Sequence, residues 1–198
     1  YLAKEKGKNR HIIYEERLHG KLESDDMQNM AMAYAVSKEK KREVITKMIT
    51  ELCVSGVNSI VKKEERLQQI RSLFDLDGIT IYSESGAQLV CRNGNYMVEV
   101  PDGRGLFEDE KYLALFGDDD NFIESNTLKL RFQDPAAFAV MQKQEIGASL
   151  QCLSRKEGVP NVIVNFDVFN RNRKWSDEDI TLLTILGHCI GNLLNYSE

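Results

Sequence analysis

The sequence predicts an α+β fold, an antiparallel sheet with the N- and C-terminal helices packed on one of its faces. Apolar residues recur at helical spacing near both ends of the chain. Strand-like runs bounded by turn residues lie between these helical stretches. Strands flanked by helices at both ends are typical of α+β domains, because the helices then share one face of the sheet.

The first helical stretch covers about 26–54. Apolar residues recur there at intervals of three to four, first around Met30 and again around Met48. The segment 37–43 between them is charged and has no apolar face. Two interpretations stay open: one long helix with a solvent-bridging turn, or two helices that flank a polar break. A second helix is predicted over 57–74, before the turn sequence DLDG.

The middle of the chain predicts a hairpin and a short helix. Strands are expected over 79–83 and 87–92, with a turn at 84–86. The stretch 108–117 predicts a short helix with acids at its start and Gly117 at its end.

The later half predicts one more helix, two strands and a final helix. Asp134 followed by proline is a strong helix start. Ser176 with Asp179 three residues later is a capping-box variant, and an apolar stripe follows it. The predicted elements are a helix over 135–143, strands over 148–153 and 162–169, and a helix from about 177 to the end.

Alternation along the last strand predicts one apolar and one mixed sheet face. Asn165 and Asp167 share a face with Ile163, away from the valines on either side of them. Gln151 and Tyr82 fall on the corresponding face of two other strands. Buried polar groups need partners or a ligand, so we expect Tyr82, Gln151, Asn165 and Asp167 to bind a small molecule there. The alternative is that this face is solvated or covered by 95–134.

No motif in the sequence predicts catalysis or a metal site. Nucleophile elbows, phosphate-binding loops and zinc signatures are absent, and the four cysteines are widely spaced. The acidic run 118–121 lacks the spaced ligands of a calcium loop and predicts a solvated turn. We therefore expect no catalytic residue, no metal and no enzymatic activity in this chain.

Composition limits the partners. A formal net charge of −5 argues against a general nucleic-acid binder. No apolar run is long enough to cross a bilayer, so we expect no membrane partner. The four scattered cysteines are interpreted as reduced core thiols of a cytosolic protein, so we expect a cytoplasmic location.

The opening YLAKEKGKNRHIIY resembles the end of a GGDEF domain, the diguanylate cyclase family. Its last helix and strand typically read A-L-Y-x-A-K-x-x-G-R-N and a terminal strand, and Lys8 stands where the family usually has Arg. The resemblance implies that Lys4 and Lys8 are remnants of GTP-phosphate contacts. The signature loop and metal-binding acids of that family are absent from this chain, so it should not make cyclic di-GMP by itself.

From about residue 40 the chain resembles a GAF domain, a cytosolic sensory module. The run EIGASLQCLSRKEGVPNVIVNFDVFNRNRKWSDEDITLLTILGHCIGNLL matches the family pattern of strand, turn, strand, aromatic and capped helix, with Trp175 as the aromatic. Motifs of tetrapyrrole-binding and cyclic-nucleotide-binding relatives are not evident. We therefore expect no evident cofactor, which leaves an unidentified small ligand.

Together the resemblances imply a domain plan. Residues 1–20 would be the GGDEF remnant, 21–40 a helical connector and 41–198 a GAF-like sensor. The chain would be the regulatory module of a bacterial cyclic-di-GMP signalling protein. It would dimerise through its terminal helices and relay a ligand or partner signal to the GGDEF domain of the same polypeptide. The alternative is a ligand-free GAF scaffold for dimerisation.

Overall fold

The computed structural model describes residues 24–55, 64–84, 86–92 and 103–195. The chain divides into two compact units, 1–39 and 40–198, and the sheet belongs to the second. The opening segment with Lys4 and Lys8 lies outside the described residues. The GGDEF resemblance and the three domain boundaries therefore stay predictions.

Five strands of the described residues form one antiparallel sheet in the order β2-β1-β5-β4-β3. The predicted hairpin forms the β2–β1 edge, and β1 also pairs with the last strand, β5. The strands β4 and β5 are longer than predicted because their pairing extends up to the turn that joins them, with register shifts at 146–148 and 154–155. The strands are β1 (Gly78–Ser83), β2 (Gly86–Arg92), β3 (Asn121–Glu124), β4 (Ile146–Lys156) and β5 (Val159–Phe169).

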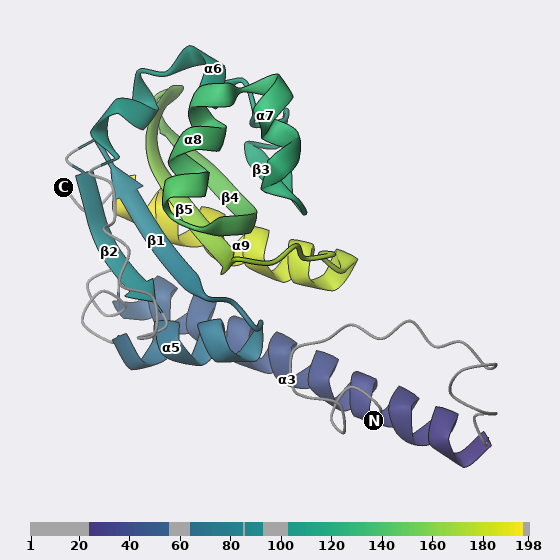
Figure 1. Cartoon of the computed structure of the whole chain (residues 1–198). Coiled ribbons are helices and arrows are strands. Elements are labelled where there is room, and N and C mark those ends of the chain that lie inside the picture. Colours follow the sequence, from purple (N-terminus) through teal and green to yellow (C-terminus); the bar gives the residue numbers. More distant parts are fainter. Residues whose placement is uncertain (1–23, 56–63, 85, 93–102, 196–198) are drawn as a thin grey trace. The chain divides into compact units, whose positions relative to one another are not determined.

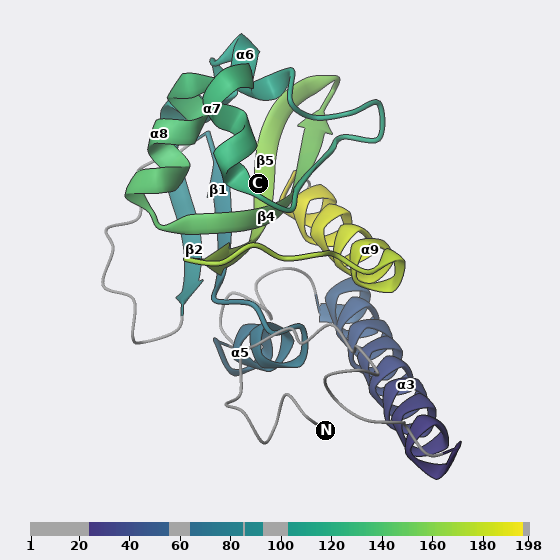
Figure 2. The ribbon, with the colours of Figure 1, turned by 45° about the vertical axis from the view of Figure 1, so that its right-hand side comes forward.

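One face of the sheet carries the predicted terminal helices, which confirms the fold class. Helices α3 (Ser24–Ser55), α5 (Glu64–Leu73) and α9 (Asp177–Asn195) contribute to the apolar core on this face. The alternating valines of β5 and Phe166 point into that core and are fully buried. In Figure 1, α9 lies behind β4 and β5, and Figure 2 shows it on the side of the strands opposite α8.

The mixed face is covered by short helices. Its core combines side chains of the strands with Tyr112, Leu130 and Met141 from the covering helices. These are η1 (Arg104–Phe107), α6 (Glu110–Leu113), η2 (Thr127–Lys129), α7 (Leu130–Gln133) and α8 (Pro135–Lys143). The sequence left open the alternative that the segment 95–134 covers this face. That alternative is confirmed in part, because η1, α6, η2 and α7 belong to the segment, whereas α8 lies beyond it.

Several element boundaries differ from the prediction. Helix α3 is a single helix, which decides between the two interpretations of 26–54. The described helix α5 begins at Glu64, and the earlier part of its predicted range lies outside the described residues. The helix predicted over 108–117 is shorter, because Gly117 N–H donates to Asn121 O and opens the turn into β3.

The two predicted helix caps are confirmed. Asp134 Oδ1 accepts hydrogen bonds from the backbone N–H of Ala136 and Ala137, both at 3.1 Å. Ser176 Oγ accepts from the N–H of Asp179 at 3.1 Å. These side chains satisfy donors at the first turns of α8 and α9, which have no partner inside the helix.

Candidate functional site

A cavity of about 280 Å³ lies between the mixed sheet face and the helices η1, α6 and α8. Most of its described wall is apolar, as in small-molecule pockets, and a few polar groups converge on it. The apolar side chains are Leu106, Ala136, Ala137, Val140, Met141 and Ile146, and the polar ones are Tyr82, Asp109, Tyr112, Gln144 and Gln151.

A second hollow of about 210 Å³ lies between α3 and α5. Its wall includes the partly exposed ion pair of Arg66 with Glu51, and it holds none of the predicted site residues. The first cavity is therefore the candidate site.

The sheet register brings the four predicted residues together. Asn165 lies opposite Gln151 on β4 and opposite Thr80 on β1. Asp167 lies opposite Ser149, one step along the same face. Tyr82 and Gln151 line the cavity, whereas Asn165 and Asp167 are buried beside them in the sheet. Their role in binding stays a prediction.

A chain of buried hydrogen bonds runs from the cavity wall into the sheet. Tyr112 Oη donates to Gln151 Oε1 at 2.5 Å, and Gln151 Nε2 donates to Ser149 Oγ at 3.0 Å. Ser149 Oγ donates to Asp167 Oδ1 at 2.7 Å. We call these four residues the Tyr112–Asp167 chain. It links a cavity residue to a carboxyl group that is 1% exposed.

Burial shifts the pKa values of the ionisable side chains in and beside the Tyr112–Asp167 chain. Desolvation raises the pKa of Asp167 to about 6, against the opposing effects of the Ser149 hydrogen bond and the Arg92 charge. Burial, and then the charge of Asp167, raises the pKa of Tyr82 and of Tyr112 well above the ordinary tyrosine value. Both tyrosines are therefore neutral near pH 7, while most Asp167 is ionised.

Two buried polar atoms of the same face have no hydrogen-bond partner among the described residues. They are Thr80 Oγ1 and Asn165 Oδ1, which lie on paired positions of β1 and β5. An unsatisfied buried polar group costs about 1–3 kcal/mol. Such a cost favours any ligand or water that can reach and pair these atoms.

Sequence reasoning missed Tyr112 and the wall formed by α8. Tyr112 lies in a short helix, and its partner Gln151 is 39 positions away in the sequence. Nothing in the local pattern signals such a pair. Gly103, with φ +80°, also closes the site, because a Cβ there would overlap the ring of Tyr82.

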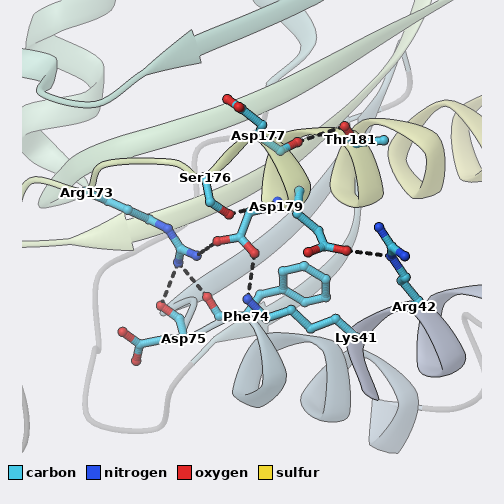
Figure 3. A network of polar contacts seen from close by, with 10 residues as sticks. Lys41, Arg42, Phe74, Asp75, Arg173, Ser176, Asp177, Asp179 and Thr181 are labelled. Atoms are coloured by element: carbon cyan, nitrogen blue, oxygen red, sulfur yellow. Dashed lines mark hydrogen bonds and ion pairs between the residues drawn. The ribbon is translucent and has the colours of Figure 1, made fainter. Parts of the chain in front are cut away.

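The opposite sheet face carries a network of charged groups that joins α3 to α9 (Figure 3). Asp179 accepts from Lys41 Nζ at 2.6 Å and from Arg173 Nη2 at 2.9 Å. Arg173 also donates to the carbonyl oxygens of Phe74 and Asp75, just after α5. We call this network the helix junction. Burial raises the pKa of Asp179, but the two cations outweigh burial and hold it below its usual value.

The described residues contain no group of His, Cys, Asp and Glu that could hold a metal ion. Cys91 and Cys152 are buried in the core on the α9 side, and neither Cys53 nor Cys189 lines the cavity. In the part of the chain that the structure describes, no helix is long and apolar enough to cross a membrane.

Comparison with known proteins identifies the fold. No protein-family model matches the sequence, and no curated protein matches it. Solved structures do match. A phycoerythrobilin-bound GAF domain from a cyanobacterial phytochrome superposes with a TM-score of 0.60 at 10% identity, over 82% of this chain and 97% of that one.

Two further solved structures give the same result. The chromophore-binding domain of a Stigmatella aurantiaca bacteriophytochrome gives a TM-score of 0.60 at 14% identity, over 81% of this chain and 61% of that one. A far-red-absorbing domain with bound biliverdin gives 0.55 at 14%, over 78% and 98%. The chain therefore has the GAF fold, an antiparallel sheet with helices packed on it. All three of these neighbours are chromophore-binding domains.

The neighbours correct the expectation that no cofactor is evident. One holds biliverdin and another holds phycoerythrobilin, so solved domains of this fold do carry a cofactor. A thioether-linked chromophore would need a cysteine at the cavity wall. None of the four cysteines of this chain lines the cavity, and a covalently attached bilin therefore does not fit these residues.

Proposed function

We propose that this chain is the sensory module of a regulatory protein and binds a small molecule non-covalently in the cavity beneath α6 and α8. The observation that carries the proposal is the buried Tyr112–Asp167 chain, which begins at an otherwise mostly apolar wall. Apolar pockets with a few convergent polar groups and perturbed pKa values are the usual form of a binding site.

The cost of the polar chain supports this function. An ionised Asp167 in the sheet destabilises the fold relative to an apolar residue, and the unpaired atoms of Thr80 and Asn165 add to that cost. Residues that break packing rules are expected at functional sites.

The sheet offers a route from the cavity to the helices. The strands β4 and β5 carry the polar chain on one face and contact α9 on the other, where Gly187 lies against Cys152 and Phe166. Helix α9 is joined to α3 through Asp179 and Lys41. A ligand that binds two arrangements of these helices with different affinity would shift their populations.

The proposal for what this signal controls rests on the sequence resemblance. We propose that the helices relay ligand binding to a GGDEF domain of the same polypeptide, in a cyclic-di-GMP signalling protein, and that the chain dimerises through its terminal helices. Lys4 and Lys8 would belong to that GGDEF domain.

The test is native mass spectrometry of the 198-residue chain, under conditions mild enough to keep a co-purified small ligand bound. A dimer that carries extra mass supports the sensor. A bare dimer supports the scaffold alternative, and a bare monomer counts against both.

A matched pair of variants assigns any ligand to the cavity. Ala137→Phe fills the cavity, whereas Ala139→Phe places the same side chain on the exposed face of α8. Loss of the ligand mass in the first variant only is expected. Loss in neither variant would place the ligand elsewhere and overturn the cavity assignment.

A further inference from the structure

The ionised carboxylate of Asp167, at the end of the Tyr112–Asp167 chain, determines the direction of every hydrogen bond in it. An ionised carboxylate can only accept, so Ser149 must donate its single proton to Asp167. Ser149 Oγ can then only accept from Gln151, which fixes Nε2 of the amide toward Ser149 and Oε1 toward Tyr112. Tyr112 must therefore donate.

With these directions fixed, the Tyr112 hydroxyl can only accept a further hydrogen bond. A phenol has one proton, and that proton is used in the bond to Gln151. The remaining capacity of Tyr112 Oη is a lone pair, and both residues of this bond line the cavity. A ligand that contacts Tyr112 Oη must bring the proton itself.

We propose that the cavity selects a largely apolar, non-anionic ligand that donates an N–H or O–H hydrogen bond to Tyr112 Oη, and that Asp167 sets this polarity from three hydrogen bonds away. The inference rests on the proposed function and names the chemistry of its ligand. The described wall is mostly apolar, and its one charged side chain, Asp109, is an acid that disfavours anionic ligands.

The size of the cavity suggests suitable probes. A dry apolar cavity of roughly 150 Å³ holds a benzene ring, so about 280 Å³ accommodates a two-ring molecule. The isomers 3-methylindole and 1-methylindole have the same atoms and nearly the same shape. Only the first has an N–H donor, so the pair isolates the hydrogen bond from the apolar contribution.

Protonation of Asp167 removes the requirement that these hydrogen bonds run in one direction. A protonated carboxyl group can donate to Ser149, and the whole chain can then run the other way and free the Tyr112 proton. Among the described residues, the charged and titratable groups that interact with Asp167 are Arg92 from β2, whose charge lowers the pKa of Asp167, and Tyr82 from β1 and Tyr112 from α6, whose pKa values the charge of Asp167 raises. Both tyrosines stay neutral between pH 5 and 8 because their pKa values are raised, so Asp167, with a pKa of about 6, is the group that titrates.

The test is an NMR titration of the ¹⁵N-labelled 198-residue chain with each isomer. At pH 7.5 we expect 3-methylindole to bind about three- to tenfold more tightly than 1-methylindole, the effect of one net hydrogen bond. The preference should shrink at pH 5. Equal binding of the two isomers at pH 7.5 overturns the inference but leaves the proposed function intact. If neither isomer shifts the amides of cavity residues, the proposed function fails and the inference fails with it.

Two tyrosine variants locate the effect. Tyr112→Phe removes the acceptor and should abolish the preference, whereas Tyr82→Phe removes the other tyrosine hydroxyl of the wall and should keep it. The opposite result would assign the selection to Tyr82 and overturn the role of the Tyr112–Asp167 chain. A dispersed spectrum of each variant shows that it is folded, and the comparison in the unmodified chain does not depend on either variant.

Discussion

The buried carboxyl group of Asp167 lowers the stability of the fold when it is ionised. Its side chain is almost fully buried and its charge is opposed by desolvation, which raises its pKa from 3.8 to about 6. A group whose pKa is higher in the folded state stabilises the fold fully below its unfolded pKa, and this contribution is lost as the pH rises through the folded value. At pH 7.5 the fold therefore bears the cost of an ionised, buried acid.

We predict that Asp167→Asn stabilises the ligand-free protein at pH 7.5. The substitution removes the buried charge and keeps a group that can hydrogen-bond with Ser149. The pKa change corresponds to about 3 kcal/mol at most. Urea unfolding at pH 7.5 and at pH 4.5 checks this, and the advantage of the variant should decline at the lower pH. A variant that is less stable at both pH values would contradict the prediction.

At the scale of single residues, the alternation of β5 predicted the polar face well. The positions of Asn165 and Asp167 follow from a period of two, which the structure keeps. The sequence could not show that Tyr112 would complete the chain, because the distance between α6 and β4 depends on how the whole covering segment packs. It also could not show which of the polar residues line the cavity and which lie in the sheet.

At the scale of elements, α9 approaches the sheet through two glycines. A Cβ at Gly187 would lie 2.9 Å from Cys152 Cβ, and one at Gly191 would lie 2.8 Å from Ser154 Cβ. Real Cβ contacts are longer, so side chains at these positions would force the helix away from β4. The glycines are thus required by close packing, although glycine disfavours a helix interior.

We predict that Gly187→Ala destabilises the fold by about 1–3 kcal/mol. Overpacking against Cys152 outweighs the gain of about 1 kcal/mol in helix propensity. The control is Asn192→Ala on the exposed side of the same helix, which should change the unfolding free energy by less than about 0.5 kcal/mol. Thermal or urea unfolding measures both. A more stable Gly187→Ala protein would show that α9 can move without cost.

The helix junction gives a second prediction for elements. Lys41→Met keeps the apolar stem but leaves Asp179 without one of its two cations, which should cost about 1–3 kcal/mol. Arg42→Met removes the neighbouring pair with Glu178, where Arg42 is 55% exposed, and should cost less than about 0.5 kcal/mol. Urea unfolding near pH 7 compares them. Equal costs would mean that burial does not distinguish the two pairs.

The pH dependence of the junction has the opposite sign to that of Asp167. The pKa of Asp179 is lowered, so its contribution is present above the ordinary value of 3.8 and is lost as the pH falls through the lower folded value. The difference between Lys41→Met and the unmodified chain should therefore persist at pH 5 and narrow only below pH 4.

Strong local signals predicted elements, and weak ones did not. Asp134 with Pro135 and Ser176 with Asp179 marked two helix starts that the structure confirms. The strand β3 was missed because its four residues, NFIE, are too few to show a pattern, and pairing with β4 defines it. The continuity of α3 could not be read from its charged middle turn.

At the scale of the whole molecule, the sheet separates the cavity from the helix junction. We predict that a ligand in the cavity slows amide hydrogen exchange in α9 as well as in α6 and α8, because β4 and β5 contact both layers. Hydrogen-exchange mass spectrometry with saturating 3-methylindole checks this, and Ala137→Phe serves as the control that should show no ligand effect. Protection confined to α6 and α8 would contradict a relay through the sheet.

The fold class was predictable because both terminal helices and the hairpin have strong local patterns. The cover of the mixed face was not, since it consists of short helices whose burial comes from long-range contacts. The cofactor expectation was wrong for a related reason: motifs of tetrapyrrole binding were sought in the sequence, while the likeness to bilin-binding domains lies in the shape of the fold.

The strand order also determines when the protein can fold during synthesis. The central strand β5 is the last to leave the ribosome, and β1 must wait for it across the interval from Gly78 to its partner Asp167. Until then the β1–β2 hairpin is an isolated ribbon, which is marginally stable in water. The apolar face of that hairpin can already pack on α5, which precedes it in the chain, whereas its mixed face stays uncovered while η1, α6, α7 and α8 are made. The edge of β1 that pairs with β5 also stays free until β5 is made, and an unpaired strand edge of this kind favours aggregation of the nascent chain.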